Sequence, residues 1–374
     1  MNDFEEYIKQ GEPEKSEKGR AWQTAIGLQE VDGLKPSPYL VETAKQNIEG
    51  DITIEEVKSR INSYYKANPA TNENDRTEEA DKVSARIAEI LTEKTFNFSL
   101  AEYLAIHKRL FSGIFKFAGE IRDYNISKAE WVLNGATVYY ASAGSLRATL
   151  THDFEKERQF DYRGITLLQA VRHIAAFVSD LWQIHAFGEG NTRTTAVFAI
   201  KYLRAFGFDV NNDLFARHSW YFRNALVRAN YNDLKNNIHA TKEYLERFFG
   251  NLLLGENNVL KNRELLVGFS GKNKAQGAKE QKEQSAQSAK EPASTISKGK
   301  ICTLDCTLEE HFVLEFLKTN PRATQKEMAV HIRKSERTVK TITTNLQQKN
   351  LLERRNGKRN GYWLVNPQPP ATHD

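Results

Sequence analysis

The sequence is poor in cysteine. Among its 374 residues only Cys302 and Cys306 are cysteines. A disulfide scaffold is therefore excluded for most of the chain, and no second Cys/His pair lies near enough to complete a zinc site. This composition is typical of a reducing compartment, and we expect a cytoplasmic protein.

Long hydrophobic runs and a one-sided charge are also missing. No stretch of about 18 apolar residues occurs, so we expect no contact with the membrane interior. The N-terminal segment MNDFEEYIKQ has neither the basic start nor the apolar stretch of a signal peptide. A net charge of +5 permits an acidic partner, such as a nucleotide or nucleic acid, without requiring one.

The composition changes between about residues 268 and 300. This stretch is rich in Lys, Gln, Ala and Ser and holds almost no large apolar side chain, so it cannot bury enough surface to fold, although part of it also suits a solvated helix. We therefore predict an N-terminal helical region (1–95), a main domain (96–255), a flexible linker (256–300) and a small C-terminal domain (301–366). The sequence does not indicate an oligomeric state.

Helical periodicity dominates upstream of this linker, which predicts a mainly α-helical fold. Apolar side chains recur at steps of three and four, and this places them on one face of a helix. The clearest stripe consists of Leu167, Val171, Ile174, Val178 and Leu181. A second stripe begins at Val197 and stops before Gly207, which suits the residue after a helix C-cap.

One segment, near residues 125–140, departs from this pattern. Asn134 and Gly135 stand between two groups of β-forming residues, which is a strong signal for a type I′ hairpin. A single hairpin in a helical domain does not build a sheet of its own. We therefore expect a projecting flap that contacts a ligand or partner, made of Val132, Leu133, Asn134 and Gly135.

Downstream of the linker the pattern predicts three short helices followed by a hairpin. Thr307 with Glu310, and Thr324 with Glu327, fit the capping-box pattern, and Ser335 suits the cap of a third helix. This is the order of elements in a winged helix-turn-helix domain of the α+β class.

Such a domain has two classes of partner. The helix from Ser335 to Lys349 would enter the major groove of DNA, and the basic side chains of the wing would grip phosphates: Arg354, Arg355, Lys358 and Arg359. Winged helices also serve as protein-docking modules, so both partners stay open.

The segment HAFGEGNTR, residues 185–193, lies between two predicted helices. The start of a helix is an anion site, because its first amides are free and its dipole is positive there. Gly188 and Gly190 would let the backbone turn its amides toward phosphate oxygens. Asn191 and Arg193 would add side-chain donors.

Two further side chains of this segment suit group transfer. Glu189 is a hard oxygen ligand of the kind that Mg²⁺ uses together with nucleotide phosphates. His185 is the residue type whose ordinary pKa suits a general base near neutral pH. The pattern favours a nucleotide and Mg²⁺ site, although a glycine-rich loop that opens a helix is also common as a purely structural feature.

This segment resembles the signature of the Fic (Fido) family, most often HPFxxGNGR, and the resemblance extends from about Phe96 to Leu254. It implies a helical Fic fold whose flap aligns a target segment by strand addition. It also implies a protein adenylyltransferase (AMPylator), a nucleotidyltransferase that moves AMP from ATP to a Ser, Thr or Tyr hydroxyl of a target protein or of itself.

The resemblance also implies individual roles. His185 would be the general base, Phe187 the anchor of the loop in the core, and Glu189 the Mg²⁺ ligand. The nucleotide would be held by Gly188, Glu189, Gly190, Asn191, Thr192 and Arg193. Tyr221 and Asn224 fall where relatives place an adenine-contacting helix, although an aromatic residue at helical spacing is also typical of a core.

Three positions depart from the family pattern. Ala186 replaces a proline, which loosens the loop without removing a ligand. Thr192 replaces a glycine, and the absence of lysine there favours AMP transfer over phosphate transfer. Ala196 stands where many members have a second arginine for the γ-phosphate, which leaves the identity of the donor open.

The N-terminal region resembles a family inhibitory helix, [ST]xxxE[GN], in degenerate form. Leu28 stands at the Ser/Thr position and Asp32 at the Glu position. Because Ala196 cannot form an ion pair, we expect Asp32 to lack a partner and its loss to change activity less than about tenfold; pairing with Arg193 is the alternative. The alternative to an enzyme is a protein of another class, a DNA-binding regulator whose Fic core binds nucleotide without turnover.

Overall fold

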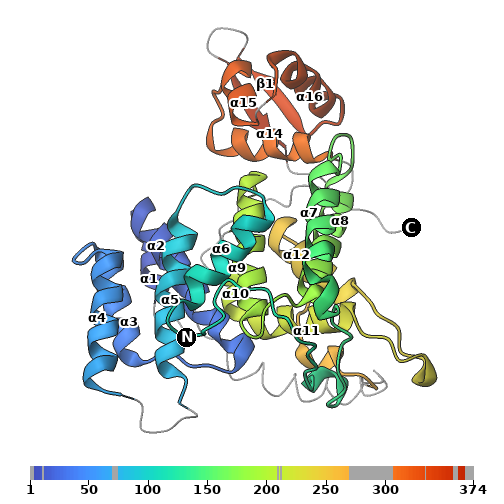
Figure 1. Cartoon of the computed structure of the whole chain (residues 1–374). Helices are drawn as coiled ribbons and strands as arrows, with labels where there is room; N and C mark the ends of the chain where they lie inside the picture. Colours follow the sequence, from blue (N-terminus) through green and yellow to red (C-terminus); the bar gives the residue numbers. More distant parts are fainter. Residues whose placement is uncertain are drawn as a thin grey trace, which may run out of the picture. The chain divides into compact units, whose positions relative to one another are not determined.

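The computed structural model describes residues 4–10, 12–69, 75–208, 210, 213–268, 306–332, 334–356 and 361–366. Helices dominate, with one two-stranded sheet (Figure 1), so the prediction of a mainly α-helical fold is confirmed. Among the described helices, none is long and apolar enough to cross a membrane.

The chain forms two compact units. The first comprises Met1–Phe160 and His173–Asn262, and the second comprises Asp161–Arg172 and Arg263–Asp374. The expected border at residue 95 is therefore not a border between units, and the second unit includes a segment far upstream of the predicted linker. Residues 269–300 of that linker lie outside the described residues.

The N-terminal part of the first unit is a bundle of helices. These are α1 (Glu5–Gln10), α2 (Pro13–Gly27), the 3₁₀ turn η1 (Leu28–Asp32), α3 (Pro38–Glu49), α4 (Ile54–Ala67) and α5 (Thr77–Thr92). Ser37 caps α3, and Thr53 with Glu56 forms a capping box on α4. Helices α2 and α5 pack along each other (Figure 1), and η1 continues directly from α2 toward α9 and α11.

The rest of the first unit surrounds one buried helix. Its elements are α6 (Leu100–Phe111), η2 (Trp131–Leu133), η3 (Ala143–Ser145), α7 (Leu146–Gln159), α8 (Leu167–Ile184) from residue 173 onward, α9 (Asn191–Ala205), α10 (Asp213–Arg217), α11 (Ser219–Ala229), η4 (Leu234–Asn236) and α12 (Glu243–Leu253). The 3₁₀ turn η5 (Asn262–Leu265) begins at the last residue of this unit. Every residue of α9 from Asn191 to Leu203 is buried. The predicted apolar stripe of α8 is buried throughout, which confirms its helical assignment.

The predicted hairpin near residues 125–140 is wrong in its strands. Trp131–Leu133 is a 3₁₀ turn, and residues 125–140 contain no strand. The Asn-Gly signal itself is real, since Asn134 and Gly135 have φ values of 54° and 89°. Val132 and Leu133 are both buried, and adjacent strand residues would point to opposite faces. Core packing therefore fixes a tight turn here instead of a projecting ribbon.

From residue 306 onward, the described part of the second unit consists of three helices and the sheet. Its elements are α14 (Leu308–Thr319), α15 (Gln325–His331), α16 (Glu336–Gln348), β1 (Leu352–Arg355) and β2 (Tyr362–Val365). The two predicted capping boxes and the Ser335 cap are present. The strands pair antiparallel, with Leu352 opposite Val365. The order of elements is as predicted, while the wing residues Lys358 and Arg359, and also Cys302, lie outside the described residues.

The small core of this unit joins helices and sheet. Trp363 on β2 is 8% exposed and its indole Nε1 donates a hydrogen bond to the Ala323 carbonyl at 3.1 Å. Cys306 is buried in the same core. Its carbonyl accepts from the Leu167 amide at 3.0 Å, so the first turn of α8 packs as part of this unit.

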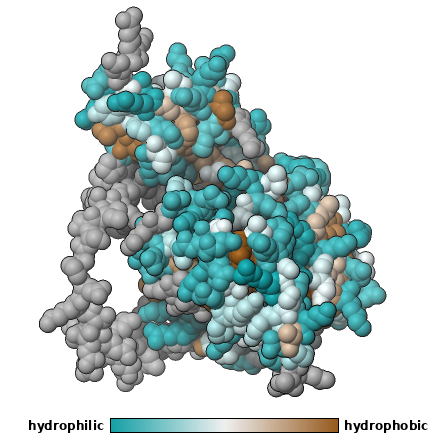
Figure 2. Space-filling view, turned by 90° about the vertical axis from the view of Figure 1, so that its left-hand side faces the viewer, coloured by the Kyte–Doolittle hydropathy of each residue, from teal (hydrophilic) through white to brown (hydrophobic). Residues whose placement is uncertain are grey.

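The molecular face shown in Figure 2 is covered mainly by hydrophilic side chains, with hydrophobic ones in small separate groups. Among the described residues, the large hydrophobic side chains left exposed include three near the 125–140 segment: Tyr124, Trp131 and Tyr139.

Candidate active site at the start of helix α9

The loop from His185 to Gly190 leads into helix α9, and the backbone amides at the start of this helix are free. Helix α9 has no side-chain N-cap. In the part of the chain that the structure describes, the backbone amides from Gly188 to Arg193 donate no hydrogen bond. Six unsatisfied donors at the positive end of a helix dipole suit an anionic group.

Both glycines of the loop are required, for different reasons. Gly190 precedes α9 with φ 76°, and a Cβ there would lie 2.4 Å from the Phe111 ring. Gly188 has no positive φ, but a Cβ would lie 2.5 Å from the Tyr124 hydroxyl and 3.2 Å from Phe117. Gly190 is therefore fixed by its positive φ and by the buried Phe111 ring, whereas a side chain at position 188 would displace the exposed Tyr124 hydroxyl.

His185 lies in the left-handed region, with φ 51°, and is 3% exposed. Its carbonyl accepts from Arg122 Nε at 2.8 Å, and the Tyr140 ring packs 4.1 Å from the imidazole. Burial holds the pKa of His185 well below its ordinary value, and the Lys128 charge lowers it further. The imidazole is therefore neutral near pH 7, and neither ring nitrogen makes a well-formed hydrogen bond within the described residues.

Sequence reasoning missed His107, a second histidine that fixes the loop. Its Nε2 lies 3.0 Å from the Glu189 carbonyl, and its Nδ1 accepts from the Gly119 amide at 2.8 Å. Because Nδ1 accepts, Nε2 carries the proton and donates to Glu189. The ring also stacks on Phe187 at 3.6 Å, and that phenylalanine is fully buried, which confirms its predicted anchoring role.

Glu189 presents a half-exposed carboxylate beside the free amides. Its Oε2 lies 3.1 Å from Lys128 Nζ, and 43% of its side chain is exposed. A cationic group thus already sits against this oxygen, and a hard carboxylate suits Mg²⁺. Within the described residues no cluster of three His, Cys, Asp or Glu side chains could hold a metal by itself. Glu189 fits a metal that takes its other ligands from phosphates and water.

Two predicted nucleotide contacts are structural instead. The Asn191 side chain accepts from the Phe187 amide at 3.0 Å and donates to the Phe187 carbonyl at 2.7 Å, so it closes the loop on itself. The Thr192 hydroxyl accepts from Trp182 Nε1 at 3.0 Å. Both side chains are buried. Their main-chain amides, and not their side chains, remain for an anion.

Arg193 is completely buried and held by three side chains from the N-terminal helices. Its Nη1 donates to Gln29 at 3.1 Å and its Nη2 to Glu79 at 2.7 Å. Its Nε lies 2.7 Å from Asp32 Oδ2, an ion pair without hydrogen-bond alignment. The expectation that Asp32 has no partner is therefore wrong, and the alternative pairing with Arg193 is what the structure shows.

Tyr221 and Asn224 are not exposed at the loop. Both lie on α11 and are at most 1% exposed. The Asn224 amide donates to Asn262 at 2.8 Å. Helix α11 packs against η1. Neither side chain is therefore open to a ligand in this structure.

The 125–140 segment is fastened beside His185. Arg122 donates to the carbonyls of His185, Tyr124 and Ala141. Glu130, 1% exposed, pairs with Arg223 on α11 at 2.6 Å. The segment is therefore structured and contacts His185 through the Tyr140 ring, although it contains no strands.

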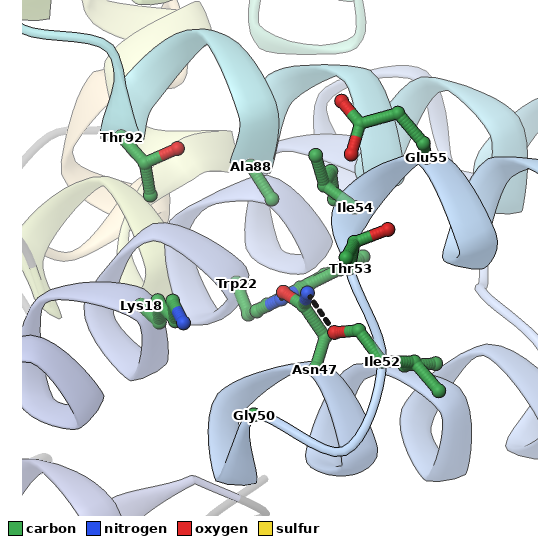
Figure 3. Close-up of a pocket in the computed structure, with 10 residues that line it drawn as sticks. All are labelled: Lys18, Trp22, Asn47, Gly50, Ile52, Thr53, Ile54, Glu55, Ala88 and Thr92. Atoms are coloured by element: carbon green, nitrogen blue, oxygen red, sulfur yellow. Dashed lines mark hydrogen bonds between the residues drawn. The ribbon is translucent and has the colours of Figure 1, made fainter.

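A pocket of about 340 Å³ lies elsewhere, among α2, α5 and the turn between α3 and α4 (Figure 3). Asn47 links its walls, accepting from Trp22 Nε1 at 3.0 Å and donating to the Ile52 carbonyl at 2.9 Å. No residue of the 185–193 loop lines it. The chemistry-bearing side chains belong to the helix start and not to this pocket.

Comparison with known proteins agrees with the site. Residues 97–203 match the sequence model of the Fic/DOC family, and this stretch contains the whole loop from residue 185 to residue 193. The protein adenylyltransferase VbhT of Bartonella schoenbuchensis is 27% identical over 116 residues, which are 31% of this chain and 23% of VbhT. The chain thus spans about a quarter of the length of that relative.

A solved Fic family protein from Desulfovibrio desulfuricans G20 is also similar in outline. The alignment covers 99% of this chain and 92% of that one, with 10% identity and a TM-score of 0.40. A superposition this loose supports no structural detail.

Proposed function

We propose that this chain is a protein adenylyltransferase that transfers AMP from ATP to a hydroxyl group of a protein. One observation carries the proposal: a buried, neutral His185 directly precedes a helix start with six free amides. The Fic/DOC match over residues 97–203 and the similarity to VbhT support it.

The reaction needs only groups that the site offers. The acceptor hydroxyl attacks the α-phosphorus, and its proton passes to the His185 imidazole. The bond between the α-phosphorus and the pyrophosphate oxygen breaks, and pyrophosphate leaves with the electron pair. The amides at the start of α9 stabilise negative charge on the transferred group. No covalent intermediate on the protein is required.

Glu189 would hold Mg²⁺ in exchange for Lys128. When bound, the metal neutralises charge on the phosphates of the leaving group. Lys128 lies on the segment that covers His185, so its release from Glu189 would also loosen that cover. The half-exposed Glu189 carboxylate would thus engage the proposed metal, and not the anionic donor itself.

The position of the label in the donor tests the proposal. The full chain is incubated with a lysate, Mg²⁺ and ATP labelled on either the α- or the γ-phosphate. We expect protein labelling from the α-label alone, abolished by EDTA. Label from the γ-phosphate would show phosphate transfer and refute AMP transfer. A chain that binds nucleotide without labelling any protein would support the non-catalytic regulator, which the intact base does not favour.

Regulation through Arg193 is the second part of the proposal. Arg193 is the buried cation at the first turn of α9, and Gln29, Asp32 and Glu79 occupy its donors. An arginine engaged in this way is withheld from phosphates. We propose that η1 restrains the enzyme through Asp32 and that activity rises when η1 withdraws.

The second unit offers a surface suited to DNA. One face of α16 carries only exposed polar and basic side chains, namely Arg337, Lys340, Thr341, Thr344 and Gln348. The carboxylates of the unit are largely engaged, since Glu309, Glu310, Glu315 and Glu353 pair with lysines or arginine. Among the described residues, Arg337 and Lys340 have no ion-pair partner. We propose that this face contacts duplex DNA.

Salt dependence tests the DNA contact. Binding of the chain to duplex DNA is measured by fluorescence anisotropy at several salt concentrations. The double variant Arg337→Ala/Lys340→Ala should lower the salt slope by about 2, because each phosphate contact contributes about 1. The control Lys318→Ala removes a charge from α14 that Glu315 already pairs. Equal binding by both variants, or none by the wild type, would favour protein docking.

A further inference from the structure

Tyr124 has an unusual position beside the loop. Its ring is 51% exposed, but its hydroxyl reaches the backbone of Gly188, where a Cβ would lie 2.5 Å away. In the described part of the chain, no hydrogen bond to this hydroxyl is formed. A nucleophilic oxygen therefore lies beside the Cα of Gly188, at the loop that precedes helix α9.

One guanidinium fixes this tyrosine relative to the base. Arg122 Nε donates to the His185 carbonyl at 2.8 Å, and Arg122 Nη1 donates to the Tyr124 carbonyl. The Arg122 amide also donates to the Ala186 carbonyl at 2.9 Å. Two of these hydrogen bonds join the segment that carries Tyr124 to the loop that carries His185, and the third fixes Tyr124 within its own segment.

Other hydroxyls near the loop are engaged or buried. The Thr192 hydroxyl accepts from Trp182, and the Thr194 hydroxyl donates to the Gly190 carbonyl at 2.9 Å. The Tyr140 hydroxyl donates to Glu130 at 3.2 Å, and burial raises its pKa. Tyr124 combines a solvent-exposed ring with contact to the loop.

We propose that Tyr124 is the acceptor of self-adenylylation, an inference that rests on the proposed function. The Tyr124 oxygen attacks the α-phosphorus of ATP, its proton passes to His185, and pyrophosphate leaves with the electrons of the broken phosphorus–oxygen bond. The product is a tyrosine–AMP phosphodiester on the loop. Because Tyr124 lies against the loop of its own chain, the reaction is intramolecular and stops at one AMP per chain.

Peptide mapping by mass spectrometry tests the proposal. The full chain, as wild type and with Asp32→Ala, is incubated with Mg²⁺ and ATP labelled on the α-phosphate. We expect one modified residue, Tyr124, and an initial rate per chain that does not change with protein concentration. Tyr124→Phe should lose at least about nine-tenths of the self-labelling, while the control Tyr139→Phe, which removes a hydroxyl from an 82% exposed tyrosine, should keep it.

The other outcomes would refute either Tyr124 as the acceptor or the proposed function itself. Self-labelling of Tyr124→Phe at the wild-type level, or a modified residue elsewhere, refutes Tyr124 as acceptor and leaves the proposed function intact. A wild type that labels lysate proteins but not itself would likewise refute Tyr124 as acceptor and leave the proposed function intact. Weaker ATP binding by Tyr124→Phe in calorimetry, with an unchanged melting temperature, would make Tyr124 a nucleotide ligand instead. No labelling of any protein by any variant would refute the proposed function itself.

Discussion

His185 has a left-handed backbone conformation, which is unfavourable for a residue with a Cβ. Left-handed φ costs roughly 1–2 kcal/mol for such a residue, and burial without hydrogen bonds to the ring adds a further cost. Arg122 and the packed Tyr140 ring hold it in place. A conformation that its surroundings must enforce, at a group able to take up a proton, is typical of a catalytic position.

His185→Ala should abolish transfer and leave nucleotide binding nearly unchanged. The imidazole acts on the attacking hydroxyl, and loss of a general base typically costs about 10²–10⁴-fold in rate. Rates are measured with α-labelled ATP and affinity by calorimetry. His152→Ala, which removes an exposed histidine from α7, is the control. A variant with wild-type rate would remove His185 from the mechanism.

His107 should make the stability of the first unit depend on pH. Burial lowers the pKa of His107 to about 4, from an ordinary value of 6.5. The unfolded chain therefore binds a proton that the folded chain does not, so stability is lost as pH falls from about 6.5 to about 4. The free energy of unfolding can fall by at most about 3 kcal/mol as a result of this pKa shift.

Thermal unfolding between pH 7 and pH 4.5 measures this effect. His107→Phe keeps an aromatic ring beside Phe187 but cannot titrate, so its melting temperature should fall less steeply with acid than that of the wild type. His185, whose pKa is also lowered, adds a loss in the same direction in both proteins. Parallel curves for the two proteins would contradict the assignment of the loss to His107.

At the scale of elements, the short turn η1 helps to enclose Arg193. It places Gln29 and Asp32 on Arg193, and Glu79 of α5 completes the enclosure. Phe111 of α6 covers the guanidinium from another side, 4.8 Å from its centre. Three elements therefore decide whether the arginine at the start of α9 is available.

Asp32→Ala should raise the transfer rate by at least about tenfold, or roughly 1.4 kcal/mol. This replaces the expectation of a smaller change, because Asp32 does pair with Arg193. Removing one member of a buried ion pair weakens the attachment of η1 to α9. Initial rates with α-labelled ATP measure the effect.

The control for this variant is Asp51→Ala, which removes an exposed carboxylate from the turn after α3. Its rate should equal that of the wild type. An Asp32→Ala rate within a few-fold of wild type would mean that Gln29 and Glu79 hold Arg193 without help, or that η1 does not restrain the enzyme.

At the scale of the whole molecule, the second unit includes the first residues of α8. The predicted linker alone did not lead us to expect this. Thr166 pairs with Thr307 as an isolated β-bridge, and the Leu167 amide donates to the Cys306 carbonyl. Helix α8 runs from these contacts to His185. The expectation of an independent C-terminal domain that begins at residue 301 is therefore corrected by the segment 161–172.

Deletion of residues 306–374 should preserve self-labelling but lower the melting temperature. Thr166 and Gln169 form reciprocal hydrogen bonds that cap α8 without help from the second unit. Loss of the Cys306 and Thr307 contacts leaves this turn exposed. Labelling rate and thermal unfolding of the truncated and full chains measure the two effects. A folded but inactive truncation would show that the second unit supports catalysis.

The sequence by itself determined most of the helices and indicated the candidate site. Apolar spacing fixed α8, the Thr307 and Thr324 capping boxes fixed α14 and α15, and the order of HAFGEGNTR pointed to the start of α9. These features are local, because periodicity and caps act within a few residues.

Only the tertiary structure decided what each side chain at the site does. Arg193 meets Gln29 and Glu79 from 164 and 114 residues away, and no local pattern specifies such contacts. Folding also assigned Asn191 to the loop backbone and packed Val132 with Leu133 into the core, which replaced the predicted strands by a 3₁₀ turn. A buried polar group takes whichever partner the fold brings to it, because remaining unpaired is costly.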